Sequence, residues 1–224
     1  MKIATQLDIS RDLESKLSTT TIGRTIKMYD EVESTMDIAK EFARIGEPEG
    51  LVIAAQTQHK GRGRRDKTWM SIPGRGVYAS ILLRLAWPGK DTSWFALLGG
   101  VAIACTLENF GLKNVTLKWP NDVLVHGRKI AGVLVEPRVG NKNIDFVVLG
   151  VGINVLYEEK DFPESLKSCS TSCLLEGDNK SCETVMLGVL TQLDEWYSKL
   201  KNGHRDELLK AWCEQGGIAK IPSV

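Results

Sequence analysis

Long hydrophobic runs are missing from this sequence of 224 residues. No apolar stretch is long enough to span a bilayer, and the N-terminal segment carries charges where a secretion signal needs an apolar core. We therefore expect a cytoplasmic protein that does not enter a membrane. In that compartment the five cysteines are expected to remain reduced thiols.

Histidine is scarce, and the usual motifs of hydrolases are absent. The three histidines are scattered, and the chain has neither a G-x-S-x-G nor an H-E-x-x-H motif. Cys169, Cys173 and Cys182 have no convincing fourth ligand for a zinc ion. These absences argue against covalent nucleophilic catalysis and against zinc-dependent hydrolysis.

An excess of either charge is also lacking, since 29 lysines and arginines are balanced by 28 acidic residues. A nearly neutral chain is not a general coat for nucleic acid, so a local cluster of positive charge indicates a focused anion site. Such a cluster occupies residues 58–69, where Asp66 is the single acidic residue. Its cations are Lys60, Arg62, Arg64, Arg65 and Lys67.

The composition of this cluster suits a loop that binds an anion. Glycine lets backbone N–H groups approach a ligand closely, and guanidinium groups bind carboxylate and phosphate oxygens in pairs. An apolar segment at 51–55 precedes the cluster and Trp69 ends it, so both ends are anchored in a folded domain. We predict that residues 58–69, the basic loop, close over a phosphate or carboxylate. Arginine–glycine segments also occur in RNA-binding regions, so a non-catalytic anion-binding or RNA-binding protein is an alternative.

Periodicity in the apolar positions predicts one mixed sheet with helices packed on it. A helix at 93–110 is apolar on nearly all sides and is therefore expected to be buried. Ser34 and Asp37 predict a capping box at the start of a helix at 35–45, and Gly46 predicts its end. Further helices are predicted at 10–17, 183–201 and 205–213, strands at 24–32, 51–56, 76–84, 115–119, 122–126, 128–136 and 144–151, and an irregular segment at 162–179.

Two further motifs suit a nucleotide. Lys118, Asn121 and Asp122 surround the proline that ends a strand, and a point charge, an amide and a carboxylate suit phosphate and Mg²⁺. A solvated lysine and a turn-capping aspartate are the alternative interpretation. Two glycines before Asn154 leave room for a purine or pyrophosphate after a strand, whereas a bulge between strands is the simpler explanation.

Taken together, these motifs resemble the biotin protein ligases, which attach biotin to carrier domains of carboxylases. The resemblance covers about residues 21–215. It implies an α+β fold in which a mixed, largely antiparallel sheet is flanked by helices, with a catalytic domain at 1–215 and a stub of an absent SH3-like domain at 216–224. The motifs occur in the order and spacing of the family at 34–35, 58–65, 69–71, 118–122, 129–132 and 150–154.

The resemblance implies a reaction, cofactors and partners. Biotin would react with ATP and Mg²⁺ to give biotinyl-5′-AMP, and a lysine of a biotin carboxyl carrier domain would then accept the biotinyl group. A cytoplasmic enzyme is implied, and a homodimer is possible for it. No DNA partner is expected, because the N-terminal residues are too few for a helix-turn-helix domain.

The resemblance also implies roles for individual residues. The catalytic residues would be Lys118, Arg62 and Arg64, and Asp122 would hold the metal. Biotin would contact Ser34, Thr35, Met36, Gln58, Gly61, Arg62, Gly63, Arg64, Lys118 and Gly132. ATP would contact Arg62, Arg65, Trp69, Lys118, Asn121, Asp122, Gly152 and Asn154.

Three departures from the family pattern stand out. Met36 occupies a position where the family usually has asparagine, so a hydrogen bond to the biotin ring is missing or supplied by another residue. Asp66 replaces a common glycine and is expected to weaken or tune retention of the adenylate. Many relatives also continue into an SH3-like barrel.

A lipoate–protein ligase is the alternative enzyme, because it shares the fold and the adenylate chemistry that the resemblance implies. A long pocket without hydrogen-bond partners for a ureido ring would favour lipoate. Gln58 and the arginines of the basic loop favour biotin.

Overall fold

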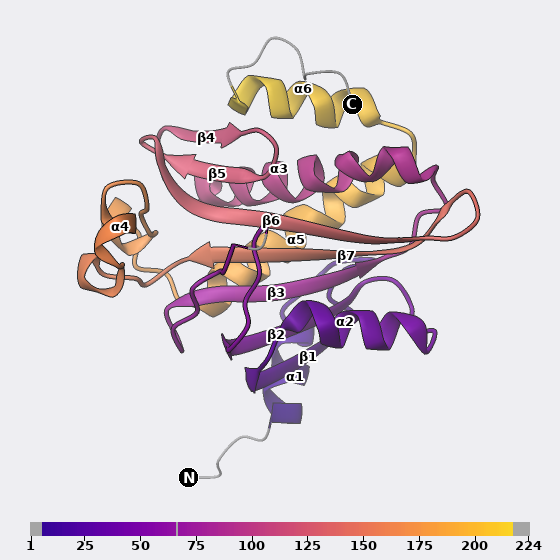
Figure 1. Ribbon diagram of the computed structural model, residues 1–224, viewed down its shortest axis with the longest axis horizontal. Helices are drawn as coiled ribbons and strands as arrows, with labels where there is room; N and C mark the ends of the chain where they lie inside the picture. Colours follow the sequence, from indigo (N-terminus) through magenta and orange to yellow (C-terminus); the bar gives the residue numbers. More distant parts are fainter. Residues whose placement is uncertain (1–5, 66, 217–224) are drawn as a thin grey trace.

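A mixed sheet of seven strands forms the centre of the computed structural model, which describes residues 6–65 and 67–216 (Figure 1). The strand order is β1-β2-β3-β7-β6-β5-β4, in which β1 and β2 run parallel and the other neighbours are antiparallel. The predicted α+β class is therefore confirmed. The strands are β1 (Thr25–Val32), β2 (Leu51–Gln58), β3 (Gly76–Leu83), β4 (Val115–Lys118), β5 (Asp122–Val125), β6 (Arg128–Val139) and β7 (Ile144–Asn154).

Helices cover both faces of this sheet. Helix α2 packs on β2, β3 and β7, whereas α3 and α5 lie on the opposite face, and α6 packs beside β4 (Figure 1). Helix α1 packs along the edge strand β1. It therefore covers this edge of the sheet and partly shields it from water. The helices are α1 (Gln6–Ser15), α2 (Thr35–Arg44), α3 (Ser93–Asn109), α4 (Glu164–Lys167), α5 (Cys182–Lys201) and α6 (Arg205–Gly216), with short 3₁₀ turns η1 (Gly89–Thr92), η2 (Glu159–Asp161) and η3 (Leu174–Glu176).

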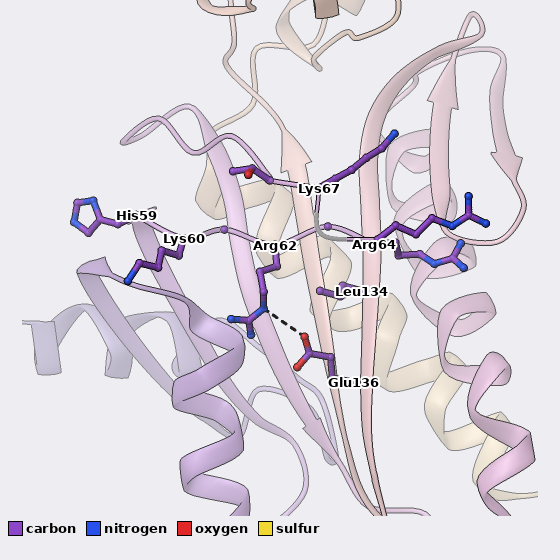
Figure 2. A pocket seen from close by; sticks show the side chains of 11 residues that line it. His59, Lys60, Arg62, Arg64, Lys67, Leu134 and Glu136 are labelled. Atoms are coloured by element: carbon purple, nitrogen blue, oxygen red, sulfur yellow. Dashed lines mark ion pairs between the residues drawn. The ribbon is translucent and has the colours of Figure 1, made fainter.

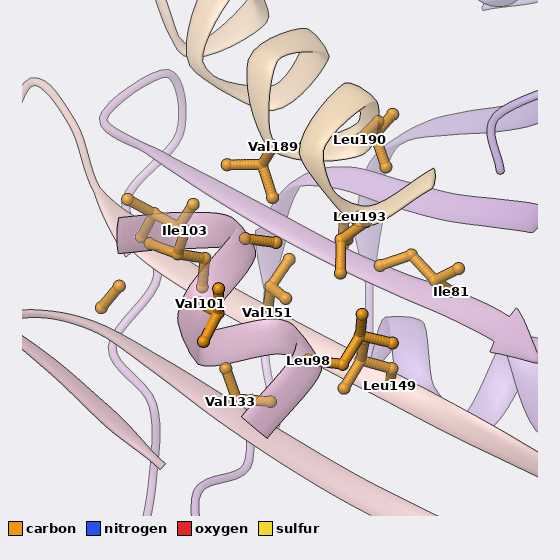
Figure 3. Close-up of a cluster of buried hydrophobic side chains, with 14 of the residues drawn as sticks. Ile81, Leu98, Val101, Ile103, Val133, Leu149, Val151, Val189, Leu190 and Leu193 are labelled. Carbon is orange, nitrogen blue, oxygen red and sulfur yellow. The ribbon is translucent and has the colours of Figure 1, made fainter. Parts of the chain in front are cut away.

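The larger hydrophobic core lies between the sheet and helices α3 and α5 (Figure 3). Val133 and Val151 of the sheet belong to it together with Leu98 and Val101 of α3. Helix α3 approaches β6 so closely that a Cβ atom at Gly99 would lie 2.8 Å from a methyl group of Val133. The prediction of a buried, apolar helix is confirmed, because strands and helices enclose α3 and leave it little contact with water.

Helix α2, which leads into the site described below, ends as predicted but begins differently. Gly46 follows the helix with φ of 93°, and the next N–H donates to the Phe42 carbonyl at 3.1 Å. Ser34 is the N-cap residue, but its side chain makes no capping hydrogen bond. The predicted capping box is wrong because Arg62 of the basic loop binds the carboxylate of Asp37 from outside the helix.

Several predicted boundaries also shift. Strand β4 ends at Lys118, because the Asn121 N–H donates to the Lys118 carbonyl at 3.2 Å and turns the chain. Strand β7 continues to Asn154, and α1 begins at Gln6 and ends at Ser15, a few residues earlier at each end than the predicted 10–17. Asp66 and the predicted stub at 217–224 lie outside the described residues.

Two further features concern the thiols and the helices. Each of the five cysteines is a free thiol. Within residues 6–65 and 67–216, no helix combines the length and hydrophobicity that a bilayer crossing needs.

Candidate active site

A cavity of about 790 Å³ opens on the same face of the sheet as α2. One row of paired residues lies along its floor and runs from Gly152 on β7 through Gly132 and Asp122 to Lys118 on β4. Side chains in one such row point to the same side of a sheet. The register therefore brings a lysine and a carboxylate together with two glycines whose missing side chains leave open space.

Trp69 at the end of the basic loop fills part of that space. A Cβ atom at Gly152 would lie 2.7 Å from the Trp69 Nε1 atom, and one at Gly132 would lie 3.1 Å from the same indole. The buried Nε1–H of Trp69 has no hydrogen-bond partner within the described residues. The glycines are needed because only a bare backbone admits the indole.

Replacing Gly152 by alanine is expected to push the indole off the floor and to destabilise the fold by about 1–3 kcal/mol, the usual cost of overpacking. Urea denaturation measures this change. The same substitution in a Trp69→Ala background should cost much less, because the clash is gone. An equal cost in both backgrounds would contradict this packing.

The described residues of the basic loop, 58–65 and 67–69, form a strap beside the cavity. Arg62 pairs with Thr68 as in a short antiparallel ladder, and the Gly63 N–H donates to the Lys67 carbonyl at 2.6 Å. The Trp69 N–H closes the strap by donating to the Gly61 carbonyl at 2.9 Å. Residues 62–65 therefore line the cavity on one side of the strap and a second hollow of about 620 Å³ on the other.

Arg62 is held by carboxylates on neighbouring elements. Its guanidinium donates to both oxygens of Asp37 on α2 at 2.7 and 2.8 Å, and its Nε atom lies 3.4 Å from Glu136 on β6. Figure 2 shows Arg62 and Glu136 turned toward one another, while Arg64 and Lys67 point away from them. Hydrogen bonding from Arg62 keeps the pKa of Asp37 below its usual range. An anionic ligand would therefore compete with two carboxylates for this arginine.

Ionisation of the Asp37 carboxyl makes the stability of the folded protein depend on pH in the acid range. Because the pKa of Asp37 is lower in the folded protein than the ordinary 3.8, its stabilising effect is complete above that value and disappears as pH falls through the folded pKa. The difference in melting temperature between wild type and Asp37→Asn is therefore expected to shrink from pH 6 to pH 3. Asp206→Asn on the exposed surface of α6 is the control. A difference that does not change with pH would count against the Arg62 interaction.

The turn after β4 supplies the other charged groups. Lys129 at the start of β6 lies 2.6 Å from Asp122, and its Nζ atom lies 5.4 Å from the centre of the Trp69 ring. The side-chain amide of Asn121 donates to the Val133 carbonyl at 2.9 Å, so the turn is fixed to β6. The sequence places Lys129 in the motif at 129–132 but predicts no role for it. Its approach to Asp122 depends on the pairing of β5 with β6, so the tertiary structure makes it a candidate site residue.

Polar side chains gather at the end of the cavity near α2. The side-chain amide oxygen of Gln58, Oε1, accepts hydrogen bonds from the Thr35 N–H at 2.9 Å and the Thr35 hydroxyl at 3.1 Å. The Thr35 hydroxyl also lies 2.7 Å from the Ser80 hydroxyl. Sequence reasoning missed Ser80, although a serine between buried apolar residues of a strand is a detectable signal. Met36 is buried beside this group, and a Cβ atom at Gly150 would lie 2.5 Å from its sulfur.

The opposite end of the cavity contains Asn154 at the end of β7. This side chain is buried, and its amide nitrogen donates to the Thr171 carbonyl at 2.9 Å. The segment at 162–170, predicted to be irregular, forms the wall there and contributes Phe162, Leu166, Cys169 and Ser170.

Almost all the residues predicted for the site line this one cavity. The exceptions are Ser34, whose buried hydroxyl has no partner within the described residues, and Gly61, which lines the second hollow. The individual roles stay predictions. The predicted residues around the cavity are Thr35, Met36, Gln58, Arg62, Gly63, Arg64, Arg65, Trp69, Lys118, Asn121, Asp122, Gly132, Gly152 and Asn154.

The donor set around Asp122 suits a metal ion that arrives with a nucleotide. Mg²⁺ usually binds proteins through one or two carboxylates and completes its shell with water and substrate phosphates. Across the described residues, no cluster of three or more histidine, cysteine or acidic side chains is arranged to hold a metal ion. A single carboxylate already paired with Lys129 fits an ion shared with phosphates better than one held by the protein alone.

A sequence model described as the "Biotin/lipoate A/B protein ligase family" matches residues 29–154, which is more than half of the chain. The chain belongs to this family. Its resemblance to biotin protein ligases, first noted from motifs, is thereby confirmed. The matched range includes the basic loop, the turn after β4 and the end of β7, so it contains most of the cavity lining.

Individual members of the family agree with this assignment. "Bifunctional ligase/repressor BirA" of Bacillus subtilis is 36% identical over 156 residues, which cover 70% of this chain and 48% of that protein. The biotin–[acetyl-CoA-carboxylase] ligase of Mycobacterium tuberculosis is 33% identical over 142 residues, which cover 62% of this chain and 50% of that protein. This chain therefore spans about half the length of these relatives.

The fold agrees with a solved member of the family. The biotin protein ligase from Aquifex aeolicus, determined in complex with biotin and ATP, superposes with a TM-score of 0.71 at 29% sequence identity. The superposition covers 85% of this chain and 78% of that structure.

Proposed function

We propose that this chain activates biotin with ATP as biotinyl-5′-AMP and transfers the biotinyl group to a lysine of a biotin carboxyl carrier domain. The observation that supports this most is the cavity that residues of the basic loop and of the Lys118–Asp122 turn both line, together with hydrogen-bonding side chains and several glycines. The names of the relatives and the biotin and ATP bound in the Aquifex aeolicus protein support the same activity.

In the first step a carboxylate oxygen of biotin would attack the α-phosphorus of ATP. The bond from that phosphorus to the oxygen bridging to the β-phosphate breaks, and pyrophosphate leaves with the electron pair. Two anions must approach each other, so Arg62, Arg64 and Lys118 would offset their repulsion and stabilise the charge of the transition state. Mg²⁺ bound with the nucleotide would neutralise phosphate charge beside Asp122.

In the second step the neutral amine of the carrier lysine would attack the acyl carbon of the adenylate. The bond between that carbon and the phosphate oxygen breaks, AMP leaves, and the amine gives up a proton. Between the two steps the mixed anhydride must be kept from water. The strap residues 62–65 and 67–68 line the cavity and suit this role, because closed loops shield reactive intermediates.

Biotin is favoured over lipoate by the hydrogen-bonding groups near α2. Gln58, Thr35 and Ser80 form a connected polar group within the cavity, which offers partners to a ureido ring. A lipoyl ring has no such N–H and carbonyl groups, so the remaining donors and acceptors of these side chains would have no ligand partner, at a cost in affinity.

A catalytic domain at 1–215, a cytoplasmic location and a homodimer complete the proposal. The carrier domain is the expected protein partner. Sedimentation at increasing protein concentration would test the dimer. The expected result is an average molecular mass that is higher in the presence of biotin and ATP than in their absence.

Pyrophosphate exchange tests the proposed reaction directly. Labelled pyrophosphate should enter ATP in the presence of biotin and much less with lipoate as the acid. Exchange with lipoate alone would assign the chain to lipoate activation. A folded protein that exchanges with neither acid, and binds RNA with an affinity that falls steeply with salt, would instead support the non-catalytic alternative.

A further inference from the structure

A buried carboxylate outside the cavity lining joins two of the cavity's walls. The Glu176 side chain is 7% exposed and belongs to η3. Its Oε1 atom accepts hydrogen bonds from the Thr171 hydroxyl at 2.6 Å and from Arg128 at 2.8 Å, and its Oε2 atom lies 2.9 Å from His126 Nδ1. The partners come from two segments, the turn between β5 and β6 and the segment before η3.

Both segments line the cavity. Gly127 lies in the turn between β5 and β6, and Cys169 and Ser170 lie in the other segment. Backbone hydrogen bonds join the segments, because the Lys129 N–H donates to the Cys169 carbonyl at 2.8 Å and the Thr171 N–H donates to the Lys129 carbonyl at 2.9 Å. Glu176 therefore stabilises the backbone contact that already joins these two cavity-lining segments.

Ionisation of Glu176 is favoured where it lies. Burial alone would raise its pKa, but hydrogen bonds from Thr171 and His126 and the charge of Arg128 together keep the pKa below its usual range. A neutral amide at this position would attract Arg128 less and would offer a single oxygen to partners that now share two.

The contact reaches Asn154 through the backbone of Thr171. The Thr171 carbonyl accepts the side-chain N–H of Asn154 at 2.9 Å, so the amide nitrogen is already bound to the protein. The amide oxygen is then the atom that Asn154 offers to a ligand in the cavity. An oxygen accepts a hydrogen bond from the 6-amino group of adenine, whereas hypoxanthine has a carbonyl at the same position.

We propose that Glu176 is a positioning residue for nucleotide selection: by holding Thr171 in place, it keeps the oxygen of Asn154 turned toward a base that carries an amino group. The proposal rests on the proposed use of ATP. A purely structural clamp would lower stability or weaken every nucleotide equally, whereas a positioning residue changes the preference between bases.

The test measures the affinities of ATP and inosine triphosphate by calorimetry on the full chain without biotin. Glu176→Gln is expected to weaken ATP binding by about 10-fold, the loss of one charged hydrogen-bond network, and to change inosine triphosphate binding little. Thr171→Val, which keeps the backbone carbonyl, should reduce the preference in the same direction but less. Glu183→Gln is the matched control, because that carboxylate pairs with Lys16 just after α1, outside the cavity.

An unchanged ratio of ATP to inosine triphosphate affinity in both variants would overturn the proposal, as would equal weakening of the two nucleotides. Thermal melting checks that Glu176→Gln folds. If that variant does not fold, the ratio of ATP to inosine triphosphate affinity in Thr171→Val tests the proposal. If the wild-type chain prefers ATP but shows no pyrophosphate exchange with biotin, the proposed function is refuted. The role of Glu176 would then still be tested by the ratio of ATP to inosine triphosphate affinity in the variants. A wild-type chain without preference for ATP would overturn the role of Glu176.

Discussion

Replacing Lys118 by alanine is expected to lower biotin-dependent pyrophosphate exchange by about 10²–10³-fold while leaving the fold intact. Lys118 is exposed at the end of β4 and lines the cavity in the same cross-strand row as Asp122. Its side chain therefore contributes little to packing. Its charge would matter most when negative charge develops on the α-phosphate, so we expect the loss mainly in kcat.

A matched control for this variant is Lys113→Ala, which removes another exposed lysine just before β4 and outside the cavity. Its exchange rate should match wild type. Lys129→Ala is the informative comparison, because Lys129 lies between Asp122 and Trp69 at the cavity floor. Near-native exchange in Lys118→Ala together with a large loss in Lys129→Ala would show that the catalytic role had been given to the wrong lysine.

Asp194→Ala is expected to cause the largest loss of stability, about 3–5 kcal/mol, because it removes a buried acceptor of several hydrogen bonds. Asp194 on α5 is 8% exposed. Its oxygens accept the backbone N–H groups of Thr20, Thr21 and Ile22 at 2.7–2.9 Å. Without the carboxylate, three backbone donors that precede β1 would lose their partner, and the one at Ile22 is buried.

Urea denaturation with a fixed m-value measures this loss, and Asp194→Asn should cost less because one oxygen acceptor remains. Glu195→Ala, an exposed neighbour on the same helix, is the control and should change stability little. A loss below about 1 kcal/mol in Asp194→Ala would contradict the anchoring role, since it would fall in the range of a single ordinary hydrogen bond.

Much of the secondary structure could be predicted because it depends on local pattern. The buried helix α3 and the strands around the sheet follow from runs of apolar residues with a helical or alternating period. Gly46 ends α2 as predicted, since a glycine adopts the required positive φ without strain. Such features depend on neighbours along the chain.

Interactions between distant segments could not be predicted in the same way. The capping box failed because Arg62, far along the chain, took the carboxylate of Asp37. The pairing of Lys129 with Asp122 and the link from Glu176 to Thr171 also depend on how strands and turns meet. A titratable side chain has several possible partners in sequence, and distance in space selects among them.

The chemical groups of the site and the segments that carry them can be read from the amino-acid sequence: a basic loop, a lysine and a carboxylate around a turn, and glycines near the end of a strand. That these groups share one cavity follows from the folded chain alone. The register across four strands places Lys118, Asp122, Gly132 and Gly152 in a single row. Register is set by long-range packing of side chains on both faces of the sheet, and that packing is not encoded in any one segment.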